Sequence, residues 1–290
     1  MQVKYLIFGV LFAGIISCQS ASIRKTSGDK PPLTEVFNIC SSWKENINWK
    51  DFQEIRTTWQ RPELFKYVNK LQANSWMKSL GIPVIPIYFA REQKGDISAE
   101  LAHLSTYVAK PTHMSANHGL IIVKNGINIR TGMAITPQKV SEQMNAVLDT
   151  PSNSNEWLLQ NMPRGFVIQE YIEGSQEIKI QTIWGQAAEI SWFEGGHTYY
   201  YYTVEGKQIG DAPPFPYMNI WQEAIKLAEK VAIGSDALRV DIMLRVNQDN
   251  KAEQLMVNEI ELRSQMYWPN NHSFTKLLNF GYRQHCPQPS

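Results

Sequence analysis

Two apolar segments of the sequence carry charged residues at alternate positions. In chain order, these residues are Arg239, Asp241, Glu259, Glu261 and Arg263. The segments 238–246 and 254–262 have the composition of strands, in which residues two apart share one face. If the strands pair as a hairpin, their carboxylates meet on one surface and could hold Mg²⁺, which prefers carboxylate and phosphate oxygens. An exposed strand face with alternating salt bridges would show the same pattern, so both interpretations stay open.

Lysines before these segments are candidates for holding an anion. Lys110 closes the apolar segment 106–111, and the residues after it, 112–119, are small or polar. A lysine can hold a phosphate as a point charge, and such a loop can offer backbone N–H groups to it. Lys70 is a second candidate. The loop has a single glycine and is no Walker loop, and solvated surface lysines are the alternative for both positions.

A third candidate is the end of the apolar segment that begins at Arg164 and closes with Ile168-Gln-Glu170-Tyr-Ile172. A strand that ends in an exposed acid beside a free backbone edge could hydrogen-bond the amino group and ring nitrogen of adenine. A strand that simply leaves the core at Gln169 would look the same.

The pattern of elements that must position these residues predicts an α+β fold. Apolar residues at helical spacing predict helices within 43–80, with a break at Pro62, and again at 140–148 and 220–231. Hairpins are predicted for 106–111 with 120–124 and for 177–183 with 187–193, and an edge strand or linker for 83–89. The sequence shows no regular alternation of strands and helices, so it does not predict a parallel sheet. We expect one part at 33–160 and a second at 161–290.

Composition and charge exclude several classes of protein. Hydrophobic residues make up 43% of the 290 residues, which excludes a disordered chain. The formal net charge of +1 gives no electrostatic footprint for nucleic acid, so no nucleic-acid partner is expected.

The first 20 residues have the pattern of a signal peptide, with a lysine before a short apolar run, and 21–32 reads as a flexible lead-in. We therefore expect a secreted protein or one of the secretory-pathway lumen. A lipid-anchored extracytoplasmic protein is the alternative, with a membrane as partner only if Cys18 is lipidated. Cys40 and Cys286 then form an even pair, either as a disulfide bond or as two free thiols.

The order of these motifs between Ile47 and Arg263 resembles the ATP-grasp superfamily and, within it, the TupA-like family of teichuronopeptide biosynthesis. The resemblance implies two sheet-bearing lobes that close on a nucleotide, with a reduced N-terminal domain. Two features depart from the pattern: the loop 112–119 is poor in glycine, and Glu261 stands where many of these enzymes have Asn.

The resemblance also implies roles for the candidate residues. Lys70, Lys110 and Lys179 would contact phosphates. Glu170, Tyr171 and Ile172 would receive adenine. Asp241, Glu259 and Glu261 would bind Mg²⁺, or Mn²⁺ in its place. Arg239 and Arg263 would be catalytic and stabilise the charge in transfer.

The activity implied is that of an ATP- and Mg²⁺-dependent ligase. Its partners would be the nucleotide, a carboxylate substrate that is activated as an acylphosphate, and an amine or other nucleophile as acceptor. Two alternatives stay open. One is a kinase-like phosphotransferase, and the other is a secreted, non-catalytic binding module on a decayed ATP-grasp scaffold.

Overall fold

The computed structural model describes residue 40 and residues 46–194, 198–249, 251–264 and 268–286. The expected signal peptide, Cys18 and the lead-in at 21–32 lie outside the described residues. Within the described part of the chain, no helix is long and apolar enough to cross a membrane.

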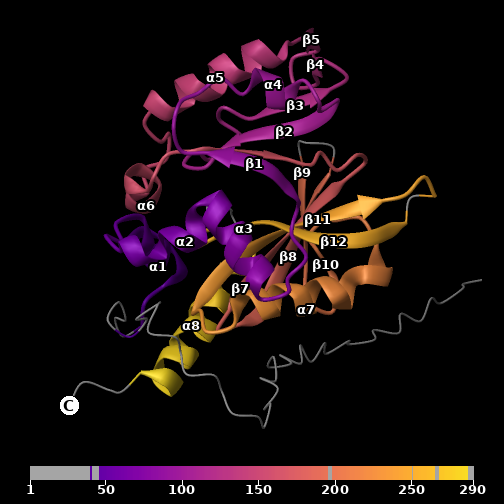
Figure 1. Ribbon diagram of the computed structural model, residues 1–290. Coiled ribbons are helices and arrows are strands. Elements are labelled where there is room, and N and C mark those ends of the chain that lie inside the picture. The colour runs from indigo at the N-terminus through magenta and orange to yellow at the C-terminus, as the bar shows by residue number, and fades with distance from the viewer. Residues whose placement is uncertain (1–39, 41–45, 195–197, 250, 265–267, 287–290) are drawn as a thin grey trace, which may run out of the picture. The chain divides into compact units, whose positions relative to one another are not determined.

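Two six-stranded antiparallel sheets, with helices packed against them, form the fold (Figure 1). The first sheet has the order β1-β6-β2-β3-β4-β5, and the second has the order β10-β9-β8-β7-β11-β12. This confirms the predicted α+β class.

The strands of the first sheet are β1 (Ile87–Arg91), β2 (Thr106–Pro111), β3 (Ile121–Lys124), β4 (Ile127–Asn128), β5 (Met133–Ala134) and β6 (Phe166–Gln169). Those of the second are β7 (Gln176–Ile183), β8 (Gln186–Glu194), β9 (Thr198–Tyr202), β10 (Gln208–Ile209), β11 (Ala237–Val246) and β12 (Ala252–Glu261). The helices are α1 (Trp49–Thr57), α2 (Phe65–Val68), α3 (Lys70–Ser79), α4 (Ser98–Leu101), α5 (Pro137–Asp149), α6 (Trp157–Asn161), α7 (Trp221–Ala232) and α8 (Asn271–His285). Short 3₁₀ helices lie at Pro62–Leu64 and Met218–Ile220.

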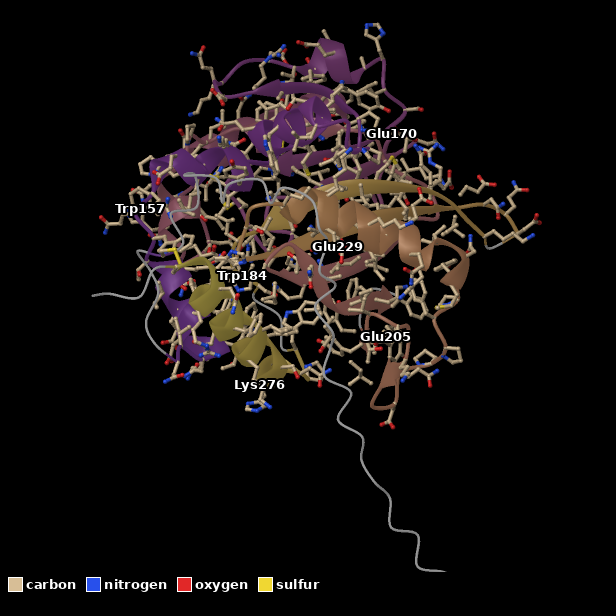
Figure 2. The ribbon with its side chains drawn as sticks, turned by 90° about the horizontal axis from the view of Figure 1, so that it is seen from below. Trp157, Glu170, Trp184, Glu205, Glu229 and Lys276 are labelled. Atoms are coloured by element: carbon tan, nitrogen blue, oxygen red, sulfur yellow. A yellow bond between two sulfur atoms is a disulfide. The ribbon has the colours of Figure 1, made fainter. Side chains whose placement is uncertain are left out.

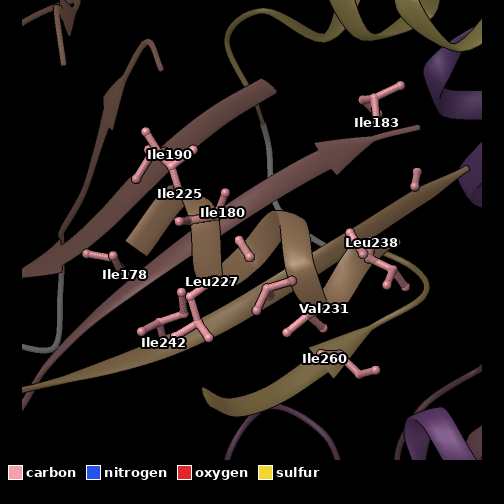
Figure 3. Packing of buried hydrophobic residues seen from close by; sticks show 14 of the residues in the cluster. Ile178, Ile180, Ile183, Ile190, Ile225, Leu227, Val231, Leu238, Ile242 and Ile260 are labelled. Carbon is pink, nitrogen blue, oxygen red and sulfur yellow. The ribbon is translucent and has the colours of Figure 1, made fainter. Parts of the chain in front are cut away.

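The second sheet buries one face against α7, and this follows from the two-residue period of its strands (Figure 3). Ile178 and Ile180 of β7 and Ile242 of β11 are fully buried in this core, together with Val231 of α7. Each such side chain contributes about 1.5–3 kcal/mol when it leaves water. Because alternate residues of a strand point to opposite faces, the residues between these isoleucines are directed to the other face of the sheet.

The first sheet is covered on one face by α4 and α5 (Figure 1). Phe166 and Ile168 of β6 pack with Val140 and Met144 of α5 in its core. Helix α5 is capped by Thr136, whose side chain accepts a hydrogen bond from the Lys139 backbone N–H, and the helix begins at Pro137. The core fixes the end of β2, where Lys110 lies.

The N-terminal helices α1–α3 pack into the core of the second sheet. The extended segment before β1 also joins this sheet, because the Val257 N–H donates to the Pro83 carbonyl and the Ile85 N–H donates to the Val257 carbonyl. Strand β6, in contrast, pairs with β1 and β2 of the first sheet. Strand β6 therefore belongs to the first sheet, although it follows the boundary that the sequence analysis predicted near Asn161.

Helix α8 is an element for which the sequence analysis makes no prediction. Its Gly281 leaves room for the Trp184 indole, because a Cβ at Gly281 would lie 1.9 Å from Trp184 Nε1. Trp184, from the β7–β8 turn, lies against the helix and donates to the Leu278 carbonyl at 3.0 Å (Figure 2). The end of α8 is joined to the N-terminal region by a disulfide between Cys40 and Cys286, whose Cα atoms are 5.3 Å apart. The structure thus has the disulfide rather than two free thiols.

Candidate functional site

A row of charged residues crosses three neighbouring strands on the face of the second sheet opposite α7. Asp241 of β11 stands opposite Lys179 of β7 on one side and opposite Glu259 of β12 on the other. Arg239 stands opposite Glu261 in the next row. The hairpin that the alternating charges predicted is therefore present, with its charged side chains in register.

Asp241 is completely buried and is held by two cations. Arg239 donates to both of its carboxylate oxygens, from Nε to Oδ1 at 2.7 Å and from Nη2 to Oδ2 at 2.8 Å. Lys179 donates to Oδ2 at 2.6 Å. Burial opposes ionisation of Asp241, but Arg239 and Lys179 outweigh it and lower its pKa to about 2. Asp241 is therefore a permanent anion inside the protein.

Glu259 and Glu261 complete a cluster of carboxylates. One oxygen from each of Asp241, Glu259 and Glu261 lies within 4.8 Å of the others. Glu261 Oε1 is 2.6 Å from Arg239 Nη2, whereas Glu261 Oε2 is buried and accepts no hydrogen bond from the described residues. Oxygen donors at this spacing, one of them without a partner, fit a hard divalent cation such as Mg²⁺.

The same cluster perturbs the acidity of its members. Burial raises the pKa of Glu261 to about 7, and the charges of Asp241 and Glu259 add to this effect, while Arg239 acts in the opposite direction. Burial also works against ionisation of Glu259, but Lys70 and the other nearby lysines lower its pKa. A cation that enters the cluster would relieve the repulsion among these carboxylates.

Two lysines reach this cluster from outside the second sheet. Lys110, at the end of β2, donates from Nζ to Asn258 Oδ1 at 2.7 Å. Lys70, at the start of α3, donates to the Met114 carbonyl at 2.9 Å and lies 3.7 Å from Glu259 Oε2. Its position is fixed by Asn69, whose side chain caps the helix by accepting from the backbone N–H groups of residues 71 and 72.

A cavity of about 510 Å³ opens over the cluster, a size typical of small-molecule sites. Lys70, Lys110 and Lys179 line it together with Arg239, and the loop after β2 forms part of its wall. The cavity therefore joins four cations to a group of carboxylates, a setting that suits a phosphate-bearing ligand and its metal.

The other predicted site residues are not among those that line this cavity. Glu170 forms an ion pair with Arg245 at 2.7 Å, and its backbone N–H donates to the Pro86 carbonyl. Ile172 is buried in a small apolar cluster, and neither it nor Tyr171 lines the cavity. Arg263 donates to Asn155 Oδ1 at 3.1 Å and is not among the lining residues. The adenine contacts and the catalytic role of Arg263 stay predictions.

Several lining residues had no predicted role. Glu177 lies 3.0 Å from Lys179 and accepts from Asn258 at 3.3 Å. Its position two residues before Lys179 was the available signal, because it places both side chains on one face of β7. Phe193, Tyr199 and Tyr201 form an aromatic wall of the cavity. The tyrosine run was visible in the sequence, but its register against β8 was not.

No protein-family model matches the chain, and no curated protein matches it. Among solved structures, the D-alanine–D-alanine ligase from Coxiella burnetii matches with a TM-score of 0.46 at 13% identity over 75% of this chain. The corresponding ligase from Helicobacter pylori matches with a TM-score of 0.49 at 15% identity over 78% of this chain. The chain spans 58% and 62% of the length of these two ligases. Because both TM-scores are below 0.5, the case for a function rests on the geometry of the site.

The burial of Asp241 leads to a prediction about stability. Asp241→Asn should lower the free energy of unfolding by about 3–5 kcal/mol, because it leaves two buried cations without their shared anion. The control Glu170→Gln removes an ion pair whose side chains are 29% and 41% exposed and should cost only about 0–1 kcal/mol. Urea unfolding of both variants measures the difference, and equal small losses would show that Asp241 is an ordinary surface charge.

A second prediction concerns Glu189 of β8. This residue is fully buried and stands opposite Gln181 of β7 in the second sheet. Burial raises its pKa from 4.5 to about 7, although hydrogen bonding by Asn270 acts in the opposite direction. The folded protein thus keeps a proton that the unfolded chain releases between these pH values. The contribution of Glu189 to the free energy of unfolding should therefore fall as the pH rises through this window, by up to about 3 kcal/mol.

Glu189→Gln removes this contribution. Relative to the parent, the variant should become more stable between about pH 4.5 and about pH 8. The control Glu92→Gln changes an exposed carboxylate. Its free energy of unfolding, measured by urea unfolding at about pH 4.5 and at about pH 8, should change between these pH values as that of the parent does. A stability difference between Glu189→Gln and the parent that is the same at both pH values would contradict the raised pKa.

Proposed function

We propose that this protein is an ATP- and Mg²⁺-dependent ligase of the ATP-grasp type that joins a carboxylate to an amine or another nucleophile. The observation that carries the proposal is the cavity in which cations from the first sheet and from α3 meet the carboxylates of β11 and β12. The order of motifs that resembles the TupA-like family points in the same direction.

In this proposal Asp241, Glu259 and Glu261 hold Mg²⁺, or Mn²⁺ in its place. The metal supplies positive charge that neutralises phosphate oxygens during phosphoryl transfer. The protein's own groups do the rest of the electrostatic work. Lys70 and Lys110 hold phosphate oxygens as point charges, and Arg239, fixed by two carboxylates, stabilises negative charge that develops beside it.

The reaction proceeds in two transfers. A substrate carboxylate oxygen attacks the γ-phosphorus of ATP, the bond to the β-phosphate oxygen breaks, and ADP leaves. The nitrogen of an amine then attacks the carbonyl carbon of the acylphosphate, phosphate leaves, and the amine loses a proton. The rigid strands that hold the cluster contribute by positioning the reacting groups.

We further propose that the protein works in an oxidising compartment, as a secreted or secretory-lumen protein. The disulfide between Cys40 and Cys286 and the signal-like first 20 residues support this location.

Nucleotide binding tests the site directly. Mg²⁺-ATP should raise the melting temperature of the parent by several degrees, because a ligand that binds the folded state stabilises it. Glu259→Gln should lose most of this rise, since it removes a metal oxygen. The matched control Glu173→Gln changes a carboxylate that is 72% exposed and lies outside the cavity lining, so it should keep the full shift. A flat response of the parent would contradict the nucleotide site.

The class of reaction has its own test. With ATP, Mg²⁺, hydroxylamine and a panel of carboxylic acids, the ligase should form a hydroxamate from its substrate, because hydroxylamine traps an acylphosphate. Mass spectrometry detects the hydroxamate, and Lys110→Met should abolish it. A phosphorylated hydroxyl product without hydroxamate would instead identify a kinase-like phosphotransferase, whereas Mg²⁺-ATP binding without product would favour the non-catalytic module.

A further inference from the structure

Lys179 occupies an unusual position among the cations of the site. Its side chain is only 9% exposed and lies between two carboxylates, with Nζ 2.6 Å from Asp241 Oδ2 and 3.0 Å from Glu177 Oε2. Lys70 and Lys110, by contrast, donate to a carbonyl and to an amide oxygen. Among these three lysines, Lys179 alone donates to the buried carboxylate of Asp241.

The oxygens of Asp241 are already engaged in this arrangement. Oδ2 accepts from both Lys179 and Arg239, and Oδ1 accepts from Arg239. A carboxylate oxygen has two lone pairs, so Oδ2 has none left for a metal. Asp241 can become a full metal ligand through Oδ2 only if one of these two donors leaves.

Lys179 is the donor that can leave. Arg239 is fixed by a planar fork of two hydrogen bonds to Asp241 and by a further contact of 2.6 Å with Glu261. Lys179 is a single point charge on a flexible stem, and it also lines the cavity, where phosphate oxygens would offer it a new partner.

We propose that Lys179 competes with the divalent metal for Asp241 and transfers to the nucleotide phosphates when the metal binds. This inference rests on the proposed function and adds a coupling to it. A metal that arrives alone must displace Lys179 from Asp241 and leave it with Glu177 as its remaining carboxylate partner. A metal that arrives with a nucleotide supplies a new partner, so the site favours the metal–nucleotide complex over the free metal.

The test is the affinity for Mn²⁺ alone, measured by electron paramagnetic resonance of the free ion. Lys179→Met removes the competitor and should tighten Mn²⁺ binding about tenfold or more over the parent. Lys179→Arg keeps a cation and should stay close to the parent. Lys110→Met is the matched control, because it removes the same charge from the same cavity but no contact with Asp241, and it should tighten binding less than threefold.

Two results would overturn the proposal. One is a Lys179→Met affinity for Mn²⁺ no tighter than that of the parent, and the other is an equal gain in Lys110→Met, which would reflect the general loss of positive charge. Circular dichroism and thermal unfolding verify that each variant is folded, and Lys179→Gln takes the place of Lys179→Met if the latter is not.

A second measurement tests the coupling. ADP should strengthen Mn²⁺ binding more in the parent than in Lys179→Met, and an equal effect in both would contradict the transfer of Lys179. The Mn²⁺ comparison needs no nucleotide. If the parent fails to bind Mg²⁺-ATP, the proposed function falls while the comparison still decides whether Lys179 competes for Asp241.

Discussion

The buried negative charge of Asp241 is the constraint on which the site depends. An isolated carboxylate in the interior of a protein is too costly to persist, so it must be paired and hydrogen-bonded. Arg239 lies two residues before it on the same strand, and Lys179 lies directly opposite on β7. The register of β7 with β11 therefore fixes both cations, and the isoleucines that alternate with them fix that register by packing against α7.

The other cations of the cavity are held beside the carboxylates of this cluster. Lys110 reaches it from the end of β2 and Lys70 from the start of α3, so groups from distant segments of the chain share one set of carboxylates. The extended segment that begins at Pro83 bonds to β12 before it enters β1, which ties the first sheet to the strand that carries Glu259 and Glu261. The site thus depends on the pairing of these segments as much as on any single residue.

Much of this could be predicted from the sequence, because alternation along a strand is a local property. The period of two placed Arg239 and Asp241 on one face, and the antiparallel hairpin with β12 is confirmed. What could not be predicted is which cations meet which anions. The pairing of Lys179 with Asp241 depends on the register of β7 against β11, over a sequence separation of 62 residues, which no local pattern encodes.

The same limit applies to β6, which follows the boundary predicted near Asn161. Strand β6 reads as an ordinary buried strand, and nothing in its residues tells which sheet it joins; the structure pairs it with β1 and β2. Helix α8 had a readable signal, since Phe274, Leu278 and Tyr282 recur at intervals of four residues and are buried. Its place against Trp184 again required the tertiary structure.

The most direct test of the central claim is a crystal structure with Mn²⁺ and a non-hydrolysable ATP analogue, in which anomalous scattering locates the metal. The account predicts a metal peak about 2.1 Å from carboxylate oxygens of Asp241, Glu259 and Glu261, with phosphate oxygens beside Lys110. A nucleotide bound elsewhere, or a cluster that excludes the metal at saturating concentration, would contradict it.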